Sequence, residues 1–201
     1  MKKEYSETEI KIKTAAKSLF LEKGYSATTT RDISKESDIN LALLNYYFTS
    51  KKKLFEIIML ETFYDFISKM VEVYNDEKSS LEEKLELTSS KYIDMIIAEP
   101  HLPTFVVNEL KNNPSSILNI LKGQIMESKL VDQYNDGVKK GIYKELDPIH
   151  FVTNILSLIV FPFISSPIII KMKKFSRKEF NEMMNERKKL IPEWIIKMIK
   201  K

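Results

Sequence analysis

Apolar residues recur every three to four positions along nearly the whole chain, which is the period of an α-helix. Alternating runs of β-branched residues, the usual mark of a strand, do not stand out, and the 201 residues include only four glycines. The pattern therefore predicts an all-α fold of about nine helices. We expect them at residues 6–23, 30–37, 41–47, 51–76, 80–98, 102–110, 114–140, 148–164 and 176–199.

Residues that cap helix ends mark most of these boundaries. A serine followed three residues later by a glutamate can satisfy the free N–H groups of a helix start, a pattern called a capping box. This pattern occurs at Ser6–Glu9, Ser80–Glu83 and Ser176–Glu179, with a looser version at Thr29–Asp32 and cap-proline pairs at Asn113–Pro114 and Asp147–Pro148. We expect helices to end at Gly24, Glu99–Pro100 and Gly141, and Pro192 to kink or split the last helix.

The first three predicted helices form an N-terminal head. The helices at 30–37 and 41–47 are too short to bury their apolar faces alone, so they need the first helix as a lid over Ile33, Ile39, Leu44 and Phe48. One face of the third helix is then left free, carrying Leu41, Ala42, Asn45 and Tyr46. A helix-turn-helix places such a face in the major groove of DNA. We expect this domain at 6–66, with its motif at about 29–48, and a second helical domain at 67–201.

The charge distribution agrees with a nucleic-acid-binding head. The first 53 residues carry 11 lysines and arginines and 7 aspartates and glutamates, whereas the rest of the chain carries 21 of each. The whole positive excess therefore lies in the head, as phosphate binding would require, although an excess of this size also arises by chance.

Composition narrows the classes of protein to which the chain can belong. The chain has no cysteine, and no apolar segment follows its N-terminal lysines, so we expect a cytoplasmic protein without disulfides. The longest apolar stretch, Ile155 to Ile170, contains two prolines and is short for a membrane span, so we interpret it as buried core. His101 and His150 are the only histidines, and no glycine-rich phosphate loop occurs. We therefore predict no enzyme activity, no metal site and no cofactor.

The stretch from Ile12 to Leu54 resembles the DNA-binding domain of the TetR family of bacterial transcriptional regulators. The shared features are Ala15–Ala16, Leu19–Phe20, Gly24–Tyr25, the threonine pair, Arg31–Asp32–Ile33, Leu44, Tyr47–Phe48, Ser50–Lys51 and Leu54. Ser34 and Asp38 stand where the family favours Ala and Gly, and Asp tolerates a left-handed turn better than most residues. Asn45 and Leu41 also depart from the family pattern, so no known operator can be carried over.

The resemblance implies roles for the head residues. Thr29, Thr30 and Tyr47 would bind phosphates, and Lys51 would add its charge to the free N–H groups of the fourth helix. Arg31 would read a guanine or bind a phosphate, Asn45 would read adenine, and Leu41 and Ala42 would touch thymine methyl groups, while Tyr46 fits either role. Asn40 would cap the recognition helix beside the DNA. As alternatives, Thr29 serves only as a cap, Tyr47 is core, and Lys51 to Lys53 form a solvated helix start.

For the second domain, the resemblance implies a pocket for a small effector and a dimer interface. Residues 51–76 form one helix that runs from the head into this domain. Effector-binding candidates are Phe63, Phe66, Met70, Met95, Phe105, Asn108, Tyr134, Phe151 and Asn154, with the two asparagines as polar anchors; core packing is the alternative. Dimer candidates are Phe161, Phe180, Met184, Ile191, Trp194 and Met198. Those in the last helix recur at spacings of three and four residues, a row that suits packing against a helix of a second subunit or of the same chain.

The expected function is a repressor that binds double-stranded operator DNA of palindromic sequence as a homodimer and is released by a small apolar effector. The alternatives are control by a protein partner, control without a ligand, and activation instead of repression.

Overall fold

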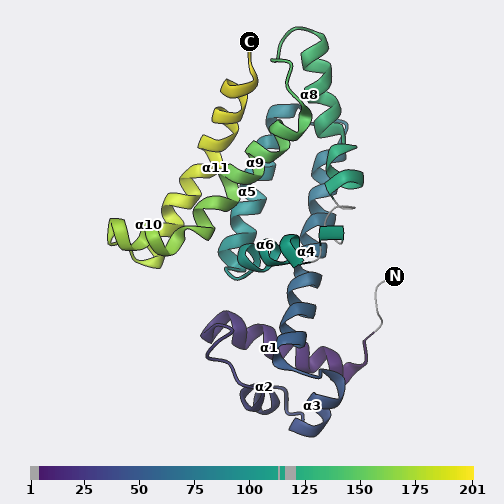
Figure 1. Cartoon of the computed structure of the whole chain (residues 1–201), viewed down its shortest axis with the longest axis vertical. Helices are drawn as coiled ribbons and strands as arrows, with labels where there is room; N and C mark the ends of the chain where they lie inside the picture. The colour runs from purple at the N-terminus through teal and green to yellow at the C-terminus, as the bar shows by residue number, and fades with distance from the viewer. Residues whose placement is uncertain (1–4, 113, 116–120) are drawn as a thin grey trace. The chain divides into compact units, whose positions relative to one another are not determined.

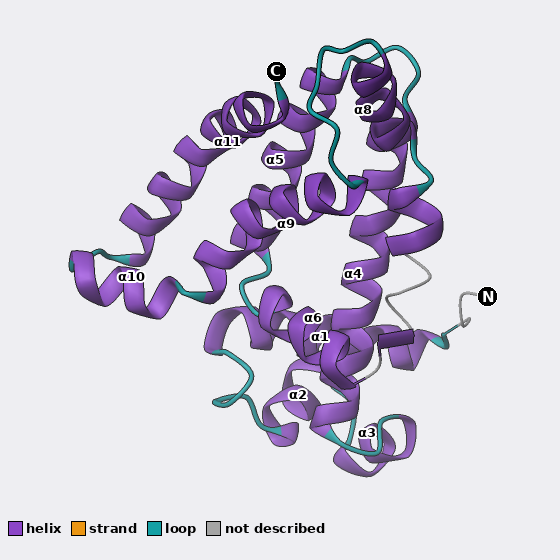
Figure 2. Ribbon diagram, turned by 45° about the horizontal axis from the view of Figure 1, so that its top comes forward, coloured by secondary structure: helices purple, strands orange, loops and turns teal. Residues whose placement is uncertain are grey.

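The computed structural model describes residues 5–112, 114–115 and 121–201, and these are almost entirely helical (Figure 2). Within them no β-strand forms beyond an isolated bridge between Tyr143 and Lys200. The elements are α1 (Glu7–Lys23), α2 (Thr30–Ser37), α3 (Leu41–Tyr47), α4 (Lys51–Asn75), α5 (Leu81–Ala98), α6 (Leu102–Asn112), η1 (Leu121–Met126), α8 (Lys129–Lys139), α9 (Pro148–Ile164), α10 (Ser166–Lys173) and α11 (Arg177–Ile199) (Figure 1). The prediction of an all-α fold is therefore confirmed.

The chain divides into two compact units, Met1–Asp65 and Phe66–Lys201, and the division falls inside α4. In the first unit, α1 packs against α2 and α2 packs against α3, with Ile12, Ile33 and Leu44 completely buried. In the second unit, α5 packs against α11 and α9.

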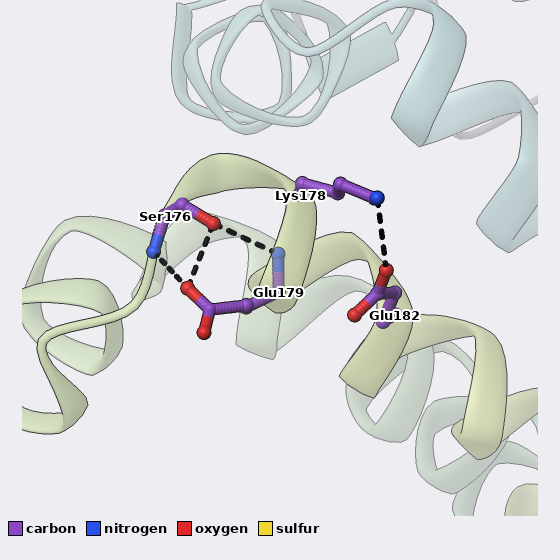
Figure 3. Close-up of polar contacts among 4 residues, drawn as sticks. All are labelled: Ser176, Lys178, Glu179 and Glu182. Carbon is purple, nitrogen blue, oxygen red and sulfur yellow. Dashed lines mark hydrogen bonds and ion pairs between the residues drawn. The ribbon is translucent and has the colours of Figure 1, made fainter.

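The predicted helix caps are present. All four Ser/Thr-to-acid pairs form full capping boxes, including Thr29 with Asp32. At the start of α11, the backbone N–H and the hydroxyl of Ser176 each lie 2.7 Å from a carboxylate oxygen of Glu179, whose own N–H donates back to the serine oxygen (Figure 3). Asp147 caps α9 ahead of Pro148, whereas Asn113 lies outside the described residues.

The prediction of one helix over 114–140 is wrong. Within the described part of this stretch, the π-helical turn η1 ends at Met126, and the separate helix α8 begins at Lys129, directly after Ser128. The Ser128 hydroxyl donates to the Ile125 carbonyl (2.6 Å), and the Lys129 N–H donates to the side chain of Asn75 at the end of α4 (3.1 Å). A local bond and a contact with the distant Asn75 therefore both lie at the break between η1 and α8.

The apolar stretch Ile155–Ile170 is not one buried segment as predicted. Ile155 and Ile159 are buried, but α9 ends at Ile164 and a separate helix, α10, exposes Ile168. Pro192 does not split α11, which is continuous to Ile199. Among the described residues no single helix is long and apolar enough to cross a membrane; α9 and α10 meet that criterion only as a pair bent by 59°.

Candidate nucleic-acid interface

The third helix exposes the side chains that were predicted to face DNA. Leu41, Ala42, Asn45 and Tyr46 are exposed, and Tyr46 retains 79% of its accessible surface. Leu44 on the opposite side of α3 is completely buried and fixes the rotation of the helix about its axis. At the helix start, the Asn40 side chain accepts a hydrogen bond from the Leu43 N–H (2.8 Å).

The two residues of the turn that depart from the family pattern both fit its geometry. Asp38 adopts a left-handed conformation (φ 55°, ψ 33°), which an aspartate tolerates without a glycine. The Ser34 hydroxyl donates to the Ile39 carbonyl at 2.6 Å. This bond ties α2 to the turn, which is a role that an alanine could not perform.

The start of α2 holds three of the predicted DNA-binding residues. Thr29 caps the helix and is exposed, Thr30 is half-buried, and Arg31 is exposed. Hydrogen bonds from the backbone N–H and the hydroxyl of Thr29, each 2.8 Å long, hold the pKa of Asp32 below its ordinary value. The cap role of Thr29 is therefore present, and its exposure leaves it accessible to a phosphate as well.

Lys51 is engaged inside the head. Its ammonium donates to the carbonyls of Tyr25 (2.9 Å) and Thr28 (2.8 Å) and lies 4.3 Å from the centre of the Tyr25 ring. An ammonium has three protons, so these bonds leave one for a phosphate. Lys51 thus anchors the start of α4 to the turn between α1 and α2, a role that sequence reasoning missed.

Two neighbouring lysines are better exposed for phosphate contact. Lys52 and Lys53 follow Lys51 in the first turn of α4, and their side chains are 79% and 59% exposed. Their nearest acidic partner, Glu56, lies 3.9 Å from each ammonium, a distance that gives weak surface pairing. The run of three lysines was the sequence signal for this patch.

Comparison with known proteins agrees with this geometry. Residues 12–58 match the model of the family described as "Bacterial regulatory proteins, tetR family". Over 166 residues, 81% of this chain and 80% of the relative, the chain is 30% identical to "Probable HTH-type transcriptional regulator YttP" of Bacillus subtilis (strain 168). The chain belongs to the TetR family. It is accordingly a DNA-binding transcriptional regulator, and the family to which it belongs is not one of enzymes.

Other similar proteins include a regulator of a biofilm operon and two regulators of solved structure. The chain is 31% identical over 142 residues to the "Biofilm operon icaADBC HTH-type negative transcriptional regulator IcaR" of Staphylococcus aureus, covering 67% of this chain and 73% of that protein. A TetR transcription regulator from Haloarcula marismortui has the same fold, with a TM-score of 0.69, 17% identity and coverage of 98% of this chain and all of the other. FadR from Bacillus subtilis, crystallised with stearoyl-CoA, gives a TM-score of 0.62 at 22% identity, over 94% and 98% of the two chains.

The predicted effector-binding residues of this TetR-family chain are mostly packed in its core. Met70, Phe105, Tyr134 and Phe151 are buried, and Phe66 is buried against Tyr92, with the two ring centres 4.4 Å apart. Phe63 and Met95 are half-buried. The two predicted polar anchors, Asn108 and Asn154, are exposed, which is not where an anchor inside a pocket would lie.

The structure brings two of these candidates into direct contact. The rings of Tyr134 on α8 and Phe151 on α9 stack at 4.7 Å and 7°. The Tyr134 hydroxyl donates to the Lys144 carbonyl at 3.0 Å, so its polar end has a partner. This pair fills space between α8 and α9 as core residues do.

A groove of about 870 Å³ lies between α5 and α11, away from the predicted effector residues. Most of its lining residues are charged, with glutamates from both helices and lysines from α11 and the residue that follows it. It is lined by Glu82, Glu86, Ser90, Lys188, Lys189, Pro192, Glu193, Ile196, Lys197 and Lys200. The surface that these residues turn toward the groove is nevertheless mainly apolar, because long charged side chains present their aliphatic stems as well as their charged ends.

The predicted dimer residues fall into two groups. Phe180, Met184 and Ile191 are 0–1% exposed and fill the core of the second unit of the same chain, because α11 packs against α5 and α9. The intramolecular alternative therefore holds for these three, and they offer a partner no surface. Phe161 and Met198 are 65% and 40% exposed, and Trp194 is half-buried. Sequence reasoning missed α10, which exposes Ile168 and Met172, each at 70%.

Proposed function

We propose that this TetR-family chain is a repressor that binds a palindromic operator as a homodimer and is released by a small apolar effector. The observation that carries the DNA-binding part is the exposed face of α3, held in one orientation by buried Leu44 and by the Asn40 cap. A helix fixed in this way can enter a major groove without first ordering itself, so more of the contact energy is available for binding.

Dimer formation is supported by uncharged, exposed surface in the second unit. Helix α9 contains no aspartate, glutamate, lysine or arginine, although 30% of the whole chain is charged. Near its end Phe161 is 65% exposed, and Ile168 and Met172 of α10 are each 70% exposed. Large apolar side chains exposed in this way favour a protein partner, and a two-fold pair of heads matches a palindromic operator.

Repression is supported by the likeness to IcaR, whose description names it a negative regulator. A repressor blocks transcription by occupying DNA at a promoter, so the sign of regulation depends on the position of the operator. Activation from another operator position is the corresponding alternative.

Release by an effector requires a difference in affinity between two states of the protein. The effector must favour a conformation whose heads no longer match the spacing of the half-sites. Effector and DNA then weaken each other by the same factor, and a tenfold loss of DNA affinity needs about 1.4 kcal/mol of differential binding.

One observation favours control by a protein partner or regulation without a ligand. Most of the predicted effector residues are buried or half-buried among their neighbours, and the two predicted polar anchors, Asn108 and Asn154, are exposed. Side chains that fill a core do not line a pocket, so these positions support a small-molecule site less than they support control without one.

The experiment that tests the proposal measures binding of the purified full chain to fragments of its own upstream DNA, at two salt concentrations and with competitor DNA. A tight, selective complex containing an even number of subunits is the expected result. Weak binding that salt abolishes and competitor removes equally from every fragment would contradict the operator-binding function. Adding candidate effectors to the selective complex then tests release.

A further inference from the structure

The recognition surface on α3 is uncharged. The helix Leu41–Tyr47 contains no acidic or basic residue, and its exposed side chains are two apolar ones, one amide and one phenol. Leu41 and Asn45 lie one turn apart in one row, and Ala42 and Tyr46 form the next row. This surface therefore offers methyl groups and neutral hydrogen-bonding groups, but no formal charge.

The four kinds of base pair make different demands in the major groove. A guanine presents two acceptors that arginine or lysine binds best, and a cytosine presents an amino donor that glutamate or aspartate accepts. An adenine presents one donor and one acceptor, which an asparagine matches with its own acceptor and donor, and a thymine adds a methyl group that apolar side chains contact. The chemistry of α3 matches adenine and thymine.

The lysine nearest to α3 in the sequence does not supply the missing charge. Lys51 donates to the carbonyls of Tyr25 and Thr28, so two of its three protons are used within the head. Arg31 is exposed, but it lies in the first turn of α2 and not on α3. A guanine contact from Arg31 would therefore fall outside the base pairs that α3 itself covers.

We infer that the base pairs read by α3 are A·T pairs, with Leu41 and Ala42 against thymine methyl groups and Asn45 paired to an adenine. The inference rests on the proposed function, because it assumes that α3 enters the major groove of an operator. It adds the base composition of the half-site core, which the family does not fix. Tyr46 extends the same surface with its hydroxyl.

The first test selects binding sequences for the full-length protein from duplexes with a randomised region. The expected result is a pair of half-sites whose central base pairs are A·T. Selective half-sites with G·C pairs at the centre would overturn this inference and leave the proposed operator binding intact. Recovery of no preferred sequence would contradict the proposed function itself, so the two failures are distinguishable.

The second test uses the selected operator with single altered bases, so it needs no protein variant. Replacing one contacted thymine by uracil removes only its methyl group and should weaken binding about fourfold, the value of one buried carbon. Replacing the contacted adenine by 7-deazaadenine removes the acceptor that the Asn45 amide would donate to. Unchanged binding at every A·T position in both series would overturn the assigned contacts.

The matched protein variant is Asn45→Ala, whose side chain is exposed and whose loss leaves the Asn40 cap in place. The variant should bind the selected operator roughly 5- to 100-fold more weakly than the wild type. At one position, 7-deazaadenine should then weaken its binding no further, because the amide that would contact the missing acceptor is gone. A variant that binds as the wild type does, with the same penalty, would contradict the role of Asn45.

Discussion

The bond between Arg187 and the Leu158 carbonyl gives a sharp prediction about the second unit. Pro162 lies four residues after Leu158 in α9 and has no N–H, so the helix cannot supply the usual donor to that carbonyl. The Arg187 guanidinium on α11 donates to it instead, with Nη2 and the carbonyl oxygen 2.8 Å apart. Replacing Pro162 by alanine restores the helical donor and makes the arginine redundant.

The magnitude follows from what each substitution removes. A hydrogen bond from a charged donor contributes about 1.5–3 kcal/mol, and Arg187 is only half-buried, so we take the lower end, about 1.5 kcal/mol. Arg187→Met also removes the contact of the guanidinium with the Trp194 ring at 5.0 Å, but this loss is the same in both backgrounds. The double-mutant cycle cancels it and isolates the bond to Leu158.

The assay is urea unfolding of the wild type, Arg187→Met, Pro162→Ala and the double variant, all at one protein concentration because self-association shifts apparent stability. We expect Arg187→Met to cost about 1–2 kcal/mol less when position 162 is alanine. Lys189→Met, at an exposed position of the same helix, is the control and should change little. Equal costs in both backgrounds, to within about 0.5 kcal/mol, would refute the role given to Arg187.

Three further predictions concern the head, the core and the caps. Lys51→Met should lower the melting temperature as well as DNA affinity, since it breaks two internal hydrogen bonds; reduced affinity with an unchanged melting temperature would contradict the anchor role. Gly137→Ala should cost about 1–3 kcal/mol in urea unfolding, because an added Cβ would clash with the Tyr143 ring, and a neutral result would contradict that packing. Hydrogen bonds from Ser176 lower the folded-state pKa of Glu179, so the stability they provide is present above the ordinary pKa of a glutamate and is lost as pH falls through the folded value. Melting temperatures followed from neutral to acidic pH should fall less steeply in Glu179→Gln, which lacks the titrating carboxylate, than in the wild type, and parallel curves would argue against this linkage.

Helix boundaries were the part of the fold best predicted from the sequence, because caps act locally. The Ser176–Glu179 pair needs only four consecutive residues to recognise, and the structure forms it as predicted. The start of α8 could not be predicted in this way, because its first N–H donates to Asn75, which is 54 residues away in the sequence. The missed helix α10 did carry a local signal, since Pro167 stands in its first turn.

The candidate DNA-binding surface also combines features set by neighbouring residues with features set by residues distant in the sequence. Exposure of Asn45 and Tyr46 follows from the spacing of Leu44 within one short helix, so the sequence predicted it. The partners of Lys51 are the carbonyls of Tyr25 and Thr28, more than twenty residues away, and only the folded head brings them together.

The row of apolar residues on α11 shows that sequence spacing does not identify the packing partner of a helix. Apolar residues at spacings of three and four suit packing against any helix, in the same chain or in another. Phe180 and Ile191 pack inside their own chain, whereas Met198 of the same helix is 40% exposed. Periodicity alone does not distinguish these cases, because the buried stripe has the same period in both.

The most direct test of the central claim is a footprint of the full chain on its selected operator, combined with the mass of the complex. The account predicts two protected half-sites, about one DNA turn or a multiple apart, bound by two subunits, and a footprint that requires more Asn45→Ala protein than wild-type protein. Protection that covers all sequences alike, or a footprint that Asn45→Ala leaves unchanged, would contradict the claim that α3 reads the operator.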